Sequence, residues 1–294
     1  MIWLIGNKGM LGTELSNALQ AAGLETVGTD RDVSILDPDA LAAFAAGKDI
    51  SWIVNCAAYT AVDKAEDEAE LAHKLNAEGP GNIGRLASAI GAHVLHISTD
   101  YVFGGAGSRP YREDDPLAPN SVYGRTKAEG EDLLLAACPE SVIIRTAWLY
   151  GKHGANFVST MLRLMKEKEK IGVVADQKGS PTWAYDLCVA IVAVLRSPEP
   201  HYGIYHFTNS GETNWHEFAT EIQHLGLEYG LLSKPCEVAA LTTAQYPSKA
   251  HRPAYSILSK DKIKKTFGIE VPEWPASLRT FFEDICGDTS SMRS

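Results

Sequence analysis

The chain has 294 residues, of which 45% are hydrophobic and 22% charged, with a formal net charge of -10. This length can bury a large core in one or two domains, and the composition excludes a collagen-like, low-complexity or largely disordered chain. The acidic surface disfavours nucleic acid and anionic membranes as partners. No apolar run reaches the roughly 18 residues of a membrane-spanning helix. The chain starts directly with an apolar run, Met1 to Gly6, so we expect no secretory leader and a cytoplasmic location.

Cysteine and histidine patterns give no sign of a metal site. The five cysteines are widely spaced and form no CxxC pair, which favours reduced structural thiols. His93 and His96 flank the strand-like Val94-Leu95, but no third ligand is nearby, so a structural role is favoured over metal binding.

The first half of the chain alternates short β-rich runs with longer amphipathic segments. Such alternation predicts an α/β fold, a Rossmann-like doubly wound parallel sheet with helices on both faces. Pro38 after Asp37 fits the first turn of a helix that Asp37 caps. The predicted strands are Ile2–Ile5, Glu25–Thr29, Trp52–Cys56, Val94–Ser98 and Val142–Arg145, and the predicted helices are Met10–Ala22, Pro38–Ala46, Glu66–Ile90 and Val122–Ala137.

The regular alternation of strands and helices becomes less clear after about residue 146. Asn156–Lys168, Asp186–Leu195 and Trp215–His224 look helical, while Ile171–Val174 and Tyr205–Phe207 look like strands. We therefore predict a dinucleotide-binding domain over residues 1–150, with part of 180–200 returning to it. Residues 151–294 are predicted to form mainly a smaller substrate-binding lobe.

Three glycines, Gly6, Gly9 and Gly12, lie where the first strand ends and a helix begins. Glycines there let the backbone turn tightly and approach a pyrophosphate, which the helix N-terminus stabilises. Their spacing is GxxGxxG and not the standard GxGxxG, but the position between strand and helix favours dinucleotide binding over a plain turn.

The end of the second predicted strand carries two residues that favour opposite cofactors. Asp30 lies where an acid receives the adenosine ribose hydroxyl of NAD, and Arg31 follows where an arginine accepts the 2′-phosphate of NADP. We therefore expect NADPH or NADH to be used, without a firm preference.

A second group of polar residues predicts acid–base chemistry. The strand Val94–Ser98 leads into Thr99 and Asp100, where ligands of a doubly wound fold bind. Tyr123 and Lys127 lie four residues apart on one face of a predicted helix. An ammonium beside the phenol lowers its pKa and makes proton transfer feasible, and Thr99 can hydrogen-bond the reacting carbonyl oxygen.

With these motifs together, the chain resembles the dTDP-4-dehydrorhamnose reductases, a family of extended short-chain dehydrogenases/reductases. The NCAAYTAVDKAE and STDYVF blocks are the most specific to that family. The matching stretches are Gly6–Gly12, Asn55–Glu66, Ser98–Phe103, Tyr123–Lys127, Arg145–Gly151, Asn156-Phe157, Asp176–Thr182 and Arg252-Pro253.

The resemblance implies an NAD(P)H-dependent reduction of the C4 keto group of a dTDP-4-keto-6-deoxysugar, with a nucleotide sugar as partner. It implies that Tyr123 donates the proton, Lys127 assists it and binds the cofactor ribose, and Thr99 orients the carbonyl. The implied cofactor contacts are Gly6, Gly9, Met10, Leu11, Gly12, Asp30, Arg31, Asp32, Val33, Ala58, Tyr59, Thr60, Tyr123 and Lys127. The implied substrate contacts are Thr99, Asp100, Trp148, Asn156 and Arg252.

Several of these residues are also compatible with a purely structural role. Trp148 fits a core position, and Ala58 and Thr60 fit the end of a buried strand. Some family members hold Mg²⁺ at a dimer contact. Glu14 matches one ligand, but Tyr185 replaces the second acid, with Asp186 beside it. A hard cation needs several oxygen ligands, so we predict no required metal, and either a monomer or a homodimer.

Two other functions stay open. A nucleotide-sugar epimerase or dehydratase has the same fold, but dehydratases of this superfamily carry an acid directly after Thr-Asp, where this chain has Tyr101. A non-catalytic regulatory subunit on the same fold has no need for the set of Thr99, Tyr123 and Lys127. The exact sugar and nucleotide base do not follow from the sequence.

Overall fold

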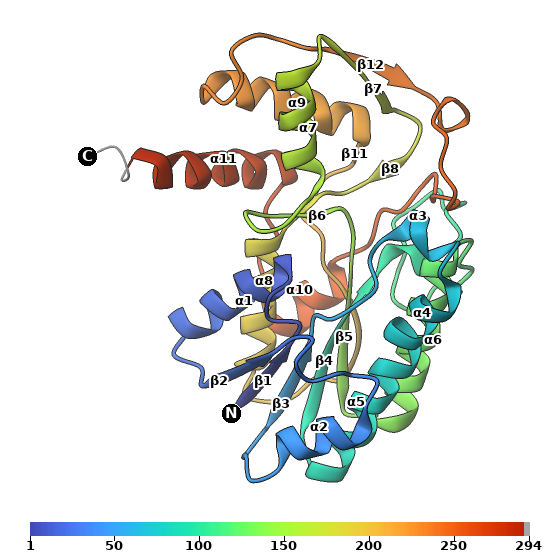
Figure 1. Ribbon diagram of the computed structural model, residues 1–294, viewed down its shortest axis with the longest axis vertical. Helices are drawn as coiled ribbons and strands as arrows, with labels where there is room; N and C mark the ends of the chain where they lie inside the picture. The colour runs from blue at the N-terminus through green and yellow to red at the C-terminus, as the bar shows by residue number, and fades with distance from the viewer. Residues whose placement is uncertain (291–294) are drawn as a thin grey trace.

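A computed structural model describes residues 1–290, and its centre is a six-stranded parallel sheet (Figure 1). The strand order is β10-β5-β4-β3-β1-β2, so the order reverses between β1 and β3. The predicted doubly wound fold is confirmed. The strands are β1 (Ile2–Ile5), β2 (Thr26–Thr29), β3 (Trp52–Asn55), β4 (His93–Thr99), β5 (Ser141–Thr146) and β10 (Gly203–His206).

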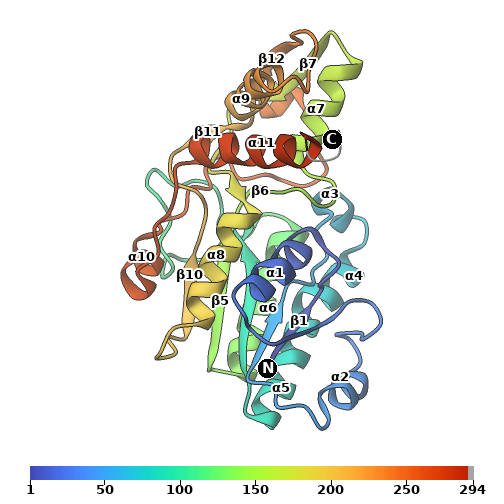
Figure 2. The same ribbon diagram turned by 90° about the vertical axis from the view of Figure 1, so that its left-hand side faces the viewer.

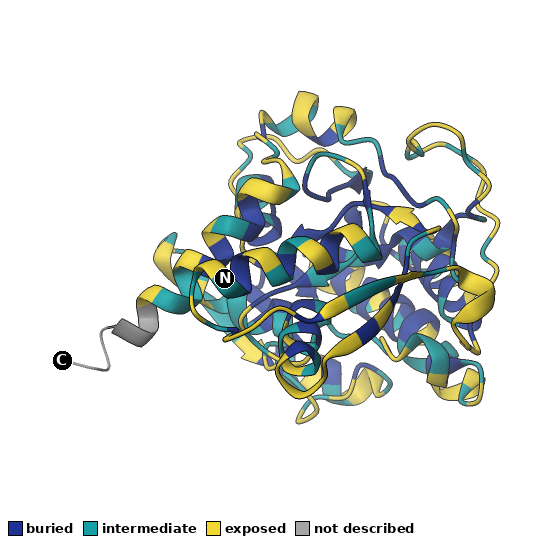
Figure 3. Ribbon diagram, turned by 90° about the horizontal axis from the view of Figure 1, so that it is seen from above, coloured by how far each residue is buried: buried dark blue, intermediate teal, exposed yellow. Residues whose placement is uncertain are grey.

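Both faces of the sheet are covered because its strands are apolar on both sides. In β1, Ile2 and Leu4 pack against α1 and α8, whereas Trp3 and Ile5 pack on the opposite side with α2, α5 and α6. Figure 3 shows the central strands buried between these helices. The helices are α1 (Met10–Ala21), α2 (Pro38–Ala45), α5 (Gly79–Ile90), α6 (Val122–Ala137) and α8 (Ala184–Leu195).

Local signals predicted most of these elements well. All five predicted strands of the first half lie in the sheet, and Asp37 caps α2 by accepting hydrogen bonds from the backbone N–H groups of Asp39 and Ala40. The predicted helix over 66–90 is wrong in one respect, because it is divided. Pro80 has no N–H to donate to the fourth residue before it, and the chain forms a π-helical turn just ahead of α5. Ahead of α5, the predicted range contains α4 (Ala69–His73) and η1 (Lys74–Glu78), and a short helix that was not predicted, α3 (Val62–Ala65), precedes it.

A second layer lies beyond the carboxyl ends of the sheet strands, at the top of Figure 1. Its core joins α7, α9 and α11 through Val158, Phe218, Ile222 and Phe282. β7 and β12 form a small parallel sheet at its far end, which Figure 2 shows from the side. The bounds are α7 (Phe157–Glu167), β7 (Lys170–Val174), α9 (Trp215–Glu228), β12 (Glu237–Leu241) and α11 (Trp274–Ser290). Two-stranded pairings join β6 (Leu149–Tyr150) to β9 (Thr182–Trp183) and β8 (Lys178–Gly179) to β11 (Thr213–Asn214).

The chain returns to the large sheet more than once. α8 lies within the predicted return over 180–200. β10, which overlaps the strand predicted over Tyr205–Phe207, and α10 (Asp261–Phe267) also return to the sheet, whereas the prediction assigned both to the smaller lobe. Ile263 of α10 joins the core that α1 and α8 form on one face of the sheet. The division into a 1–150 domain and a 151–294 lobe stays a prediction. Within residues 1–290, no helix is both long and apolar enough to cross a membrane.

Candidate active site

The glycine loop forms a cradle at the point where the strand order reverses. Gly6 has a φ of +79°, and a Cβ on it would lie 2.8 Å from the backbone nitrogen of Ala57, which follows β3. A Cβ on Gly12 would lie 2.0 Å from the Gly6 carbonyl oxygen. Only glycine fits at these two positions. The free N–H groups at the start of α1, at Met10 and Leu11, therefore border a space suited to a pyrophosphate, as predicted for a dinucleotide.

The turn after β2 lies beside this cradle. The Thr29 carbonyl accepts hydrogen bonds from the backbone N–H groups of both Gly6 and Asn7, which brings the two strand ends together. The Asp30 N–H donates to Asp32 Oδ1 at 2.8 Å, and this bond lowers the pKa of Asp32. Arg31 is exposed. The turn thus holds the residues predicted to border the adenosine, including Val33, at the edge of the cradle.

Thr99, Tyr123 and Lys127 come together at the carboxyl end of β4. Thr99 ends the strand and is 4% exposed, and its hydroxyl faces that of Tyr123 in α6 and acts on the pKa of this phenol. Lys127 lies one helical turn later, 1% exposed, with Nζ donating to the Ile97 carbonyl at 2.7 Å. The structure therefore assembles the predicted set of three.

The start of α6 is fixed by two caps. Ser121 Oγ accepts from the Gly124 N–H at 3.0 Å, and the Glu66 carboxylate accepts from the Val122 N–H at 2.8 Å. Gly124 is required because a Cβ there would lie 2.2 Å from the Tyr101 carbonyl oxygen. These contacts hold Tyr123 in place. Sequence reasoning missed Glu66, whose one signal is that it ends the NCAAYTAVDKAE block.

The electrostatics of the phenol differ from the prediction. Burial raises the pKa of Tyr123, hydrogen bonding to Thr99 lowers it somewhat, and the nearby Asp100 raises it further. The expectation that Lys127 lowers this pKa is wrong for this structure, because Nζ is directed at β4. A phenol with a raised pKa stays protonated at neutral pH, which suits a proton donor.

Asp100 is a buried acid in the same place. It is 2% exposed, and burial raises its pKa to about 6. Oδ1 accepts from the Thr99 hydroxyl at 3.0 Å. Oδ2 is buried without a hydrogen bond of good geometry, although the Ser256 hydroxyl faces the carboxyl group and opposes the effect of burial. An acceptor of this kind suits a sugar hydroxyl.

Burial also changes Lys127. It lowers the pKa of the ammonium to about 8, while the nearby Glu131 acts in the opposite direction. Glu131 itself is engaged in a buried ion pair, with Arg145 Nη2 at 2.6 Å from its Oε2. Lys127 Nζ also lies 3.1 Å from His96 Nε2. Sequence reasoning treated His96 only as a rejected metal ligand and did not connect it with Lys127.

Asn76 fixes the segment after β3 that was predicted to lead towards the nicotinamide. Its Oδ1 accepts from the Tyr59 N–H at 2.8 Å, and its Nδ2 donates to the Tyr59 carbonyl at 3.0 Å. The Tyr59 hydroxyl donates to Glu68 at 2.7 Å. Ala58 and Thr60 flank this clamped residue, so the segment is held against η1.

Trp148 has an unusual backbone just after β5. Its φ is +48°, the left-handed region that a bulky residue seldom adopts. Its indole stacks on that of Trp215, with centroids 3.6 Å apart, and a Cβ on Gly179 would lie 2.4 Å from it. Such a held non-glycine outlier is typical of functional sites, which supports the predicted substrate contact.

Asn156 and Arg252 are engaged in contacts within the protein. Asn156 caps α7 through Oδ1 and donates through Nδ2 to the Gly151 carbonyl. Arg252 donates to the Tyr101 hydroxyl at 3.0 Å and to Asp63 Oδ2 at 2.6 Å. Arg252 thereby lies beside Tyr101, whose ring packs edge-on against that of Tyr123, whereas the Asn156 amide serves a helix cap. Their substrate contacts stay predictions.

The residues considered for a metal site do not converge. Glu14 lies 3.6 Å from His153, and Asp186 Oδ2 accepts from Ser277 and from Asn209. In the part of the chain that the structure describes, no three His, Cys, Asp or Glu side chains are grouped so that they could hold a metal. The absence of a required metal stays a prediction.

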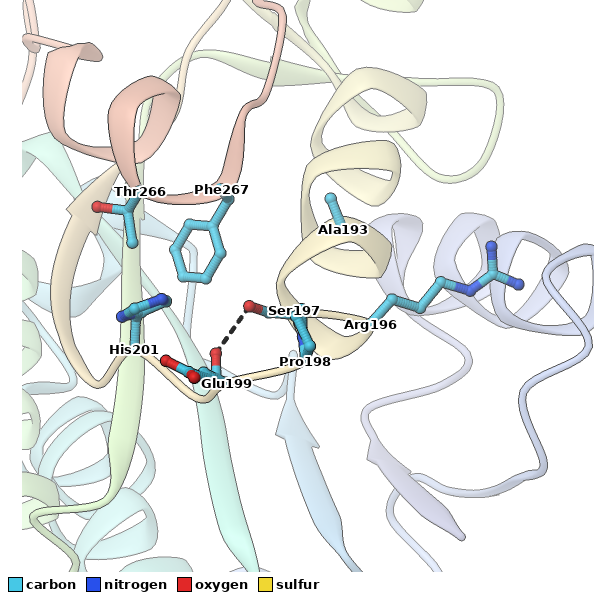
Figure 4. A pocket seen from close by; sticks show the side chains of 8 residues that line it. All are labelled: Ala193, Arg196, Ser197, Pro198, Glu199, His201, Thr266 and Phe267. Atoms are coloured by element: carbon cyan, nitrogen blue, oxygen red, sulfur yellow. Dashed lines mark hydrogen bonds between the residues drawn. The ribbon is translucent and has the colours of Figure 1, made fainter.

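A hollow of about 400 Å³ lies away from these residues (Figure 4). It is bordered by the end of α8 and by α10, next to Pro198, His201 and Phe267. It lies where β10 begins, whereas Thr99 and Lys127 lie at the opposite, carboxyl edge of the sheet. This hollow is therefore separate from the candidate active site.

The family model described as the RmlD substrate binding domain matches residues 1–286. The chain belongs to this family. The dTDP-4-dehydrorhamnose reductase of Streptomyces griseus is 41% identical to it over 97% of this chain and 94% of the relative. A probable dTDP-4,6-dihydroxy-2-methyloxan-3-one 4-ketoreductase of Streptomyces antibioticus is 43% identical, with coverage of 97% and 96%. These matches confirm the predicted resemblance.

A solved structure gives the same result in three dimensions. The dTDP-4-dehydrorhamnose reductase of Bacillus anthracis, determined in complex with NADP, superposes with a TM-score of 0.90 at 36% identity, and the match covers 96% of this chain and 98% of that one. An RmlD-family chain with this fold is an oxidoreductase of the extended short-chain dehydrogenase type.

Proposed function

We propose that this protein reduces the C4 keto group of dTDP-4-dehydro-L-rhamnose with NADPH or NADH, giving dTDP-L-rhamnose. The observation that carries the proposal is that Tyr123 lies with the buried Thr99 and Lys127 at the carboxyl end of β4, beside a glycine cradle that fits a dinucleotide. The named reductases among its relatives support the same activity.

Each residue of the site has a distinct role in the proposed reduction. Tyr123 donates its hydroxyl proton to the carbonyl oxygen as C4 is reduced, and the Thr99 hydroxyl orients that oxygen. The bound nicotinamide supplies the hydride to C4. Gly6, Gly9 and Gly12, with the start of α1, hold the pyrophosphate, and Asp30 or Arg31 receives the adenosine ribose. One C–H bond and one O–H bond form, so the carbonyl becomes a hydroxyl.

The buried Asp100 and the half-buried Trp148 bind the sugar in this proposal. Asp100 Oδ2 accepts a hydrogen bond from a ring hydroxyl, and the Trp148 indole, backed by Trp215, packs against the deoxyhexose. Carbohydrates commonly bind proteins with a flat aromatic face and a few fixed polar groups, and this pair supplies both.

A related dTDP-4-ketosugar is the second candidate substrate, because the Streptomyces antibioticus relative with a different named substrate is equally similar. Both candidates share the dTDP group and the keto group at C4. They differ only in the sugar that Asp100 and Trp148 would contact.

The test is to incubate the purified protein with each dTDP-4-keto-6-deoxysugar and NADPH, and to follow the loss of reduced-nicotinamide absorbance. We expect turnover with the rhamnose precursor and a lower kcat/KM with the alternative sugar. An unchanged signal with folded protein and both sugars contradicts the reductase, whereas the reverse preference selects the second candidate.

A further inference from the structure

Three buried side chains form a continuous chain of contacts that ends at Lys127. Asn55 Oδ1 accepts from the Ala57 backbone N–H at 3.0 Å, and Asn55 Nδ2 lies 3.0 Å from His96 Nδ1. On the other side of the ring, His96 Nε2 lies 3.1 Å from Lys127 Nζ. Asn55 and His96 are 0% exposed and are register partners in the parallel strands β3 and β4. The geometry is therefore fixed by the sheet.

The backbone determines the direction of these hydrogen bonds. The Ala57 N–H can only donate, so the amide oxygen of Asn55 must face it, and the amide nitrogen must face His96. An amide nitrogen also only donates, so Nδ1 of His96 must accept. Burial and the charge of Lys127 hold the pKa of His96 well below its ordinary value, so the ring is neutral. Its single proton is then on Nε2.

The Nε2–H bond points at Lys127 Nζ. An ammonium nitrogen has no lone pair, so a charged Lys127 and Nε2–H would be two donors facing each other at 3.1 Å. An uncharged amine has a lone pair and accepts this bond. The other contact of Nζ, to the Ile97 carbonyl, suits both forms because each can donate. The whole chain of hydrogen bonds is therefore satisfied only when Lys127 is uncharged.

Other groups near Lys127 do not reverse this preference. Glu131 favours the ammonium, but its carboxylate is bound by Arg145 and by the Ser98 hydroxyl. Cys56 also favours it, yet burial raises the pKa of its thiol to about 12, so the thiol stays neutral. Tyr123, one helical turn before Lys127, stays neutral for the same reason.

We propose that Asn55 and His96 are positioning residues that hold the imidazole in its Nε2–H tautomer and thereby ease the loss of a proton from Lys127. The functional meaning rests on the proposed reductase, in which Tyr123 loses its proton to the product. A lysine that releases a proton near neutral pH can restore the phenol when Nζ turns from β4 towards Tyr123, one turn earlier in α6. Its amine then accepts the Nε2–H bond until solvent returns the proton.

The first measurement needs no substrate. Protein labelled with ¹⁵N-histidine is followed by NMR between about pH 5.5 and pH 9.5, and His96→Gln identifies the His96 signals by their loss. We expect an unprotonated Nδ1 and a protonated Nε2 for His96 throughout this range. A protonated Nδ1 in the wild-type protein overturns the proposal.

The second measurement follows the titration of Lys127 through its labelled Cε, identified with Lys127→Met. In Asn55→Asp, a carboxylate accepts from both Ala57 and the imidazole, so the ring proton moves to Nδ1 and Nε2 can accept from the ammonium. The midpoint of Lys127 should rise by about one pH unit or more. The negative charge that Asn55→Asp adds would by itself raise the Lys127 midpoint. His96→Gln adds no charge and can offer its amide oxygen to Nζ. The proposal therefore requires that His96→Gln also raises the midpoint.

His93→Gln is the matched control. His93 begins the same strand, at the end away from Lys127, and contacts the Tyr202 hydroxyl there. It should leave the Lys127 midpoint unchanged. A midpoint that stays the same in His96→Gln overturns the proposal, even where Asn55→Asp fails to fold.

The pH profile of kcat then connects the chain to turnover. A midpoint near pH 8 leaves about one-tenth of Lys127 charged at pH 9, and a midpoint near 10 leaves about nine-tenths. The ratio of kcat at pH 9 to kcat at pH 7 should therefore rise several-fold in His96→Gln. An unchanged ratio with a shifted NMR midpoint refutes the link to turnover. Absent turnover of the wild-type protein, with the expected NMR result, contradicts only the proposed function.

Discussion

Asp100→Asn should make the protein more stable at neutral pH, and the gain should depend on pH. Asp100 is 2% exposed, and burial raises its pKa from 3.8 to about 6. One pKa unit corresponds to about 1.4 kcal/mol, so the ionised carboxylate lowers the free energy of unfolding by about 3 kcal/mol. Asparagine has nearly the same shape and carries no charge, so it removes this penalty.

The sign follows from proton binding. Between about pH 4 and pH 6 the folded protein binds more protons at Asp100 than the unfolded chain does, so stability falls as the pH rises through this window. The penalty is absent below about pH 4 and complete above about pH 7. The expected gain from Asp100→Asn is therefore about 3 kcal/mol at pH 8 and about half of that at pH 5.

Urea unfolding of both proteins at pH 5 and pH 8 measures these free energies. Asp132→Asn, on the exposed side of α6, is the matched control and should change stability little at either pH. The reasoning is refuted when Asp100→Asn gives the same gain at both pH values, or none at pH 8. The same variant should lose turnover, because Asp100 is proposed to bind the sugar.

Four further variants test the site. Tyr123→Phe should lower kcat by about 10²–10⁴-fold and leave the Kd of the nucleotide nearly unchanged, and a variant that keeps a third of wild-type turnover removes Tyr123 from the mechanism. Arg31→Ala should raise the KM for NADPH by about tenfold and leave the KM for NADH almost unchanged. Asp30→Ala should raise the KM for NADH and leave the KM for NADPH almost unchanged. Equal changes in both KM values contradict the assignment of these residues to the adenosine ribose. Gly124→Ala should lower stability by about 1–3 kcal/mol and lower kcat, because its Cβ would lie 2.2 Å from the Tyr101 carbonyl oxygen. Thermal unfolding and steady-state rates of this variant check both effects, and wild-type values for both refute the close contact.

The sequence predicted the elements whose signals are local. β1 and β3 are apolar on both faces and lie within one residue of their expected bounds, and the helix predicted over Val122–Ala137 is observed with those bounds because Ser121 caps it. Thr99, Tyr123 and Lys127 were identified because their spacing and their places at element ends are visible in one dimension.

The features that were missed depend on distant partners. The strand predicted over Tyr205–Phe207 overlaps β10, but its place in the large sheet was missed, because pairing with β5, far earlier in the chain, decides it. Glu66 reaches the start of α6 across 56 residues. His96 meets Asn55 and Lys127 only because strand register and helix packing bring them together. No local pattern encodes such contacts.

The position of β10 late in the sequence also affects folding of the chain during its synthesis. Before residues 203–206 have left the ribosome, β5 has a partner only in β4, and its apolar stretch Val142–Ile144 borders an open sheet edge. At about 5–20 residues per second, translation from β5 to β10 takes several seconds. Unpaired strand edges are templates for association with other chains. The nascent protein is therefore prone to aggregation in this interval, which ends when β10, the last strand of the large sheet to be synthesised, pairs with β5.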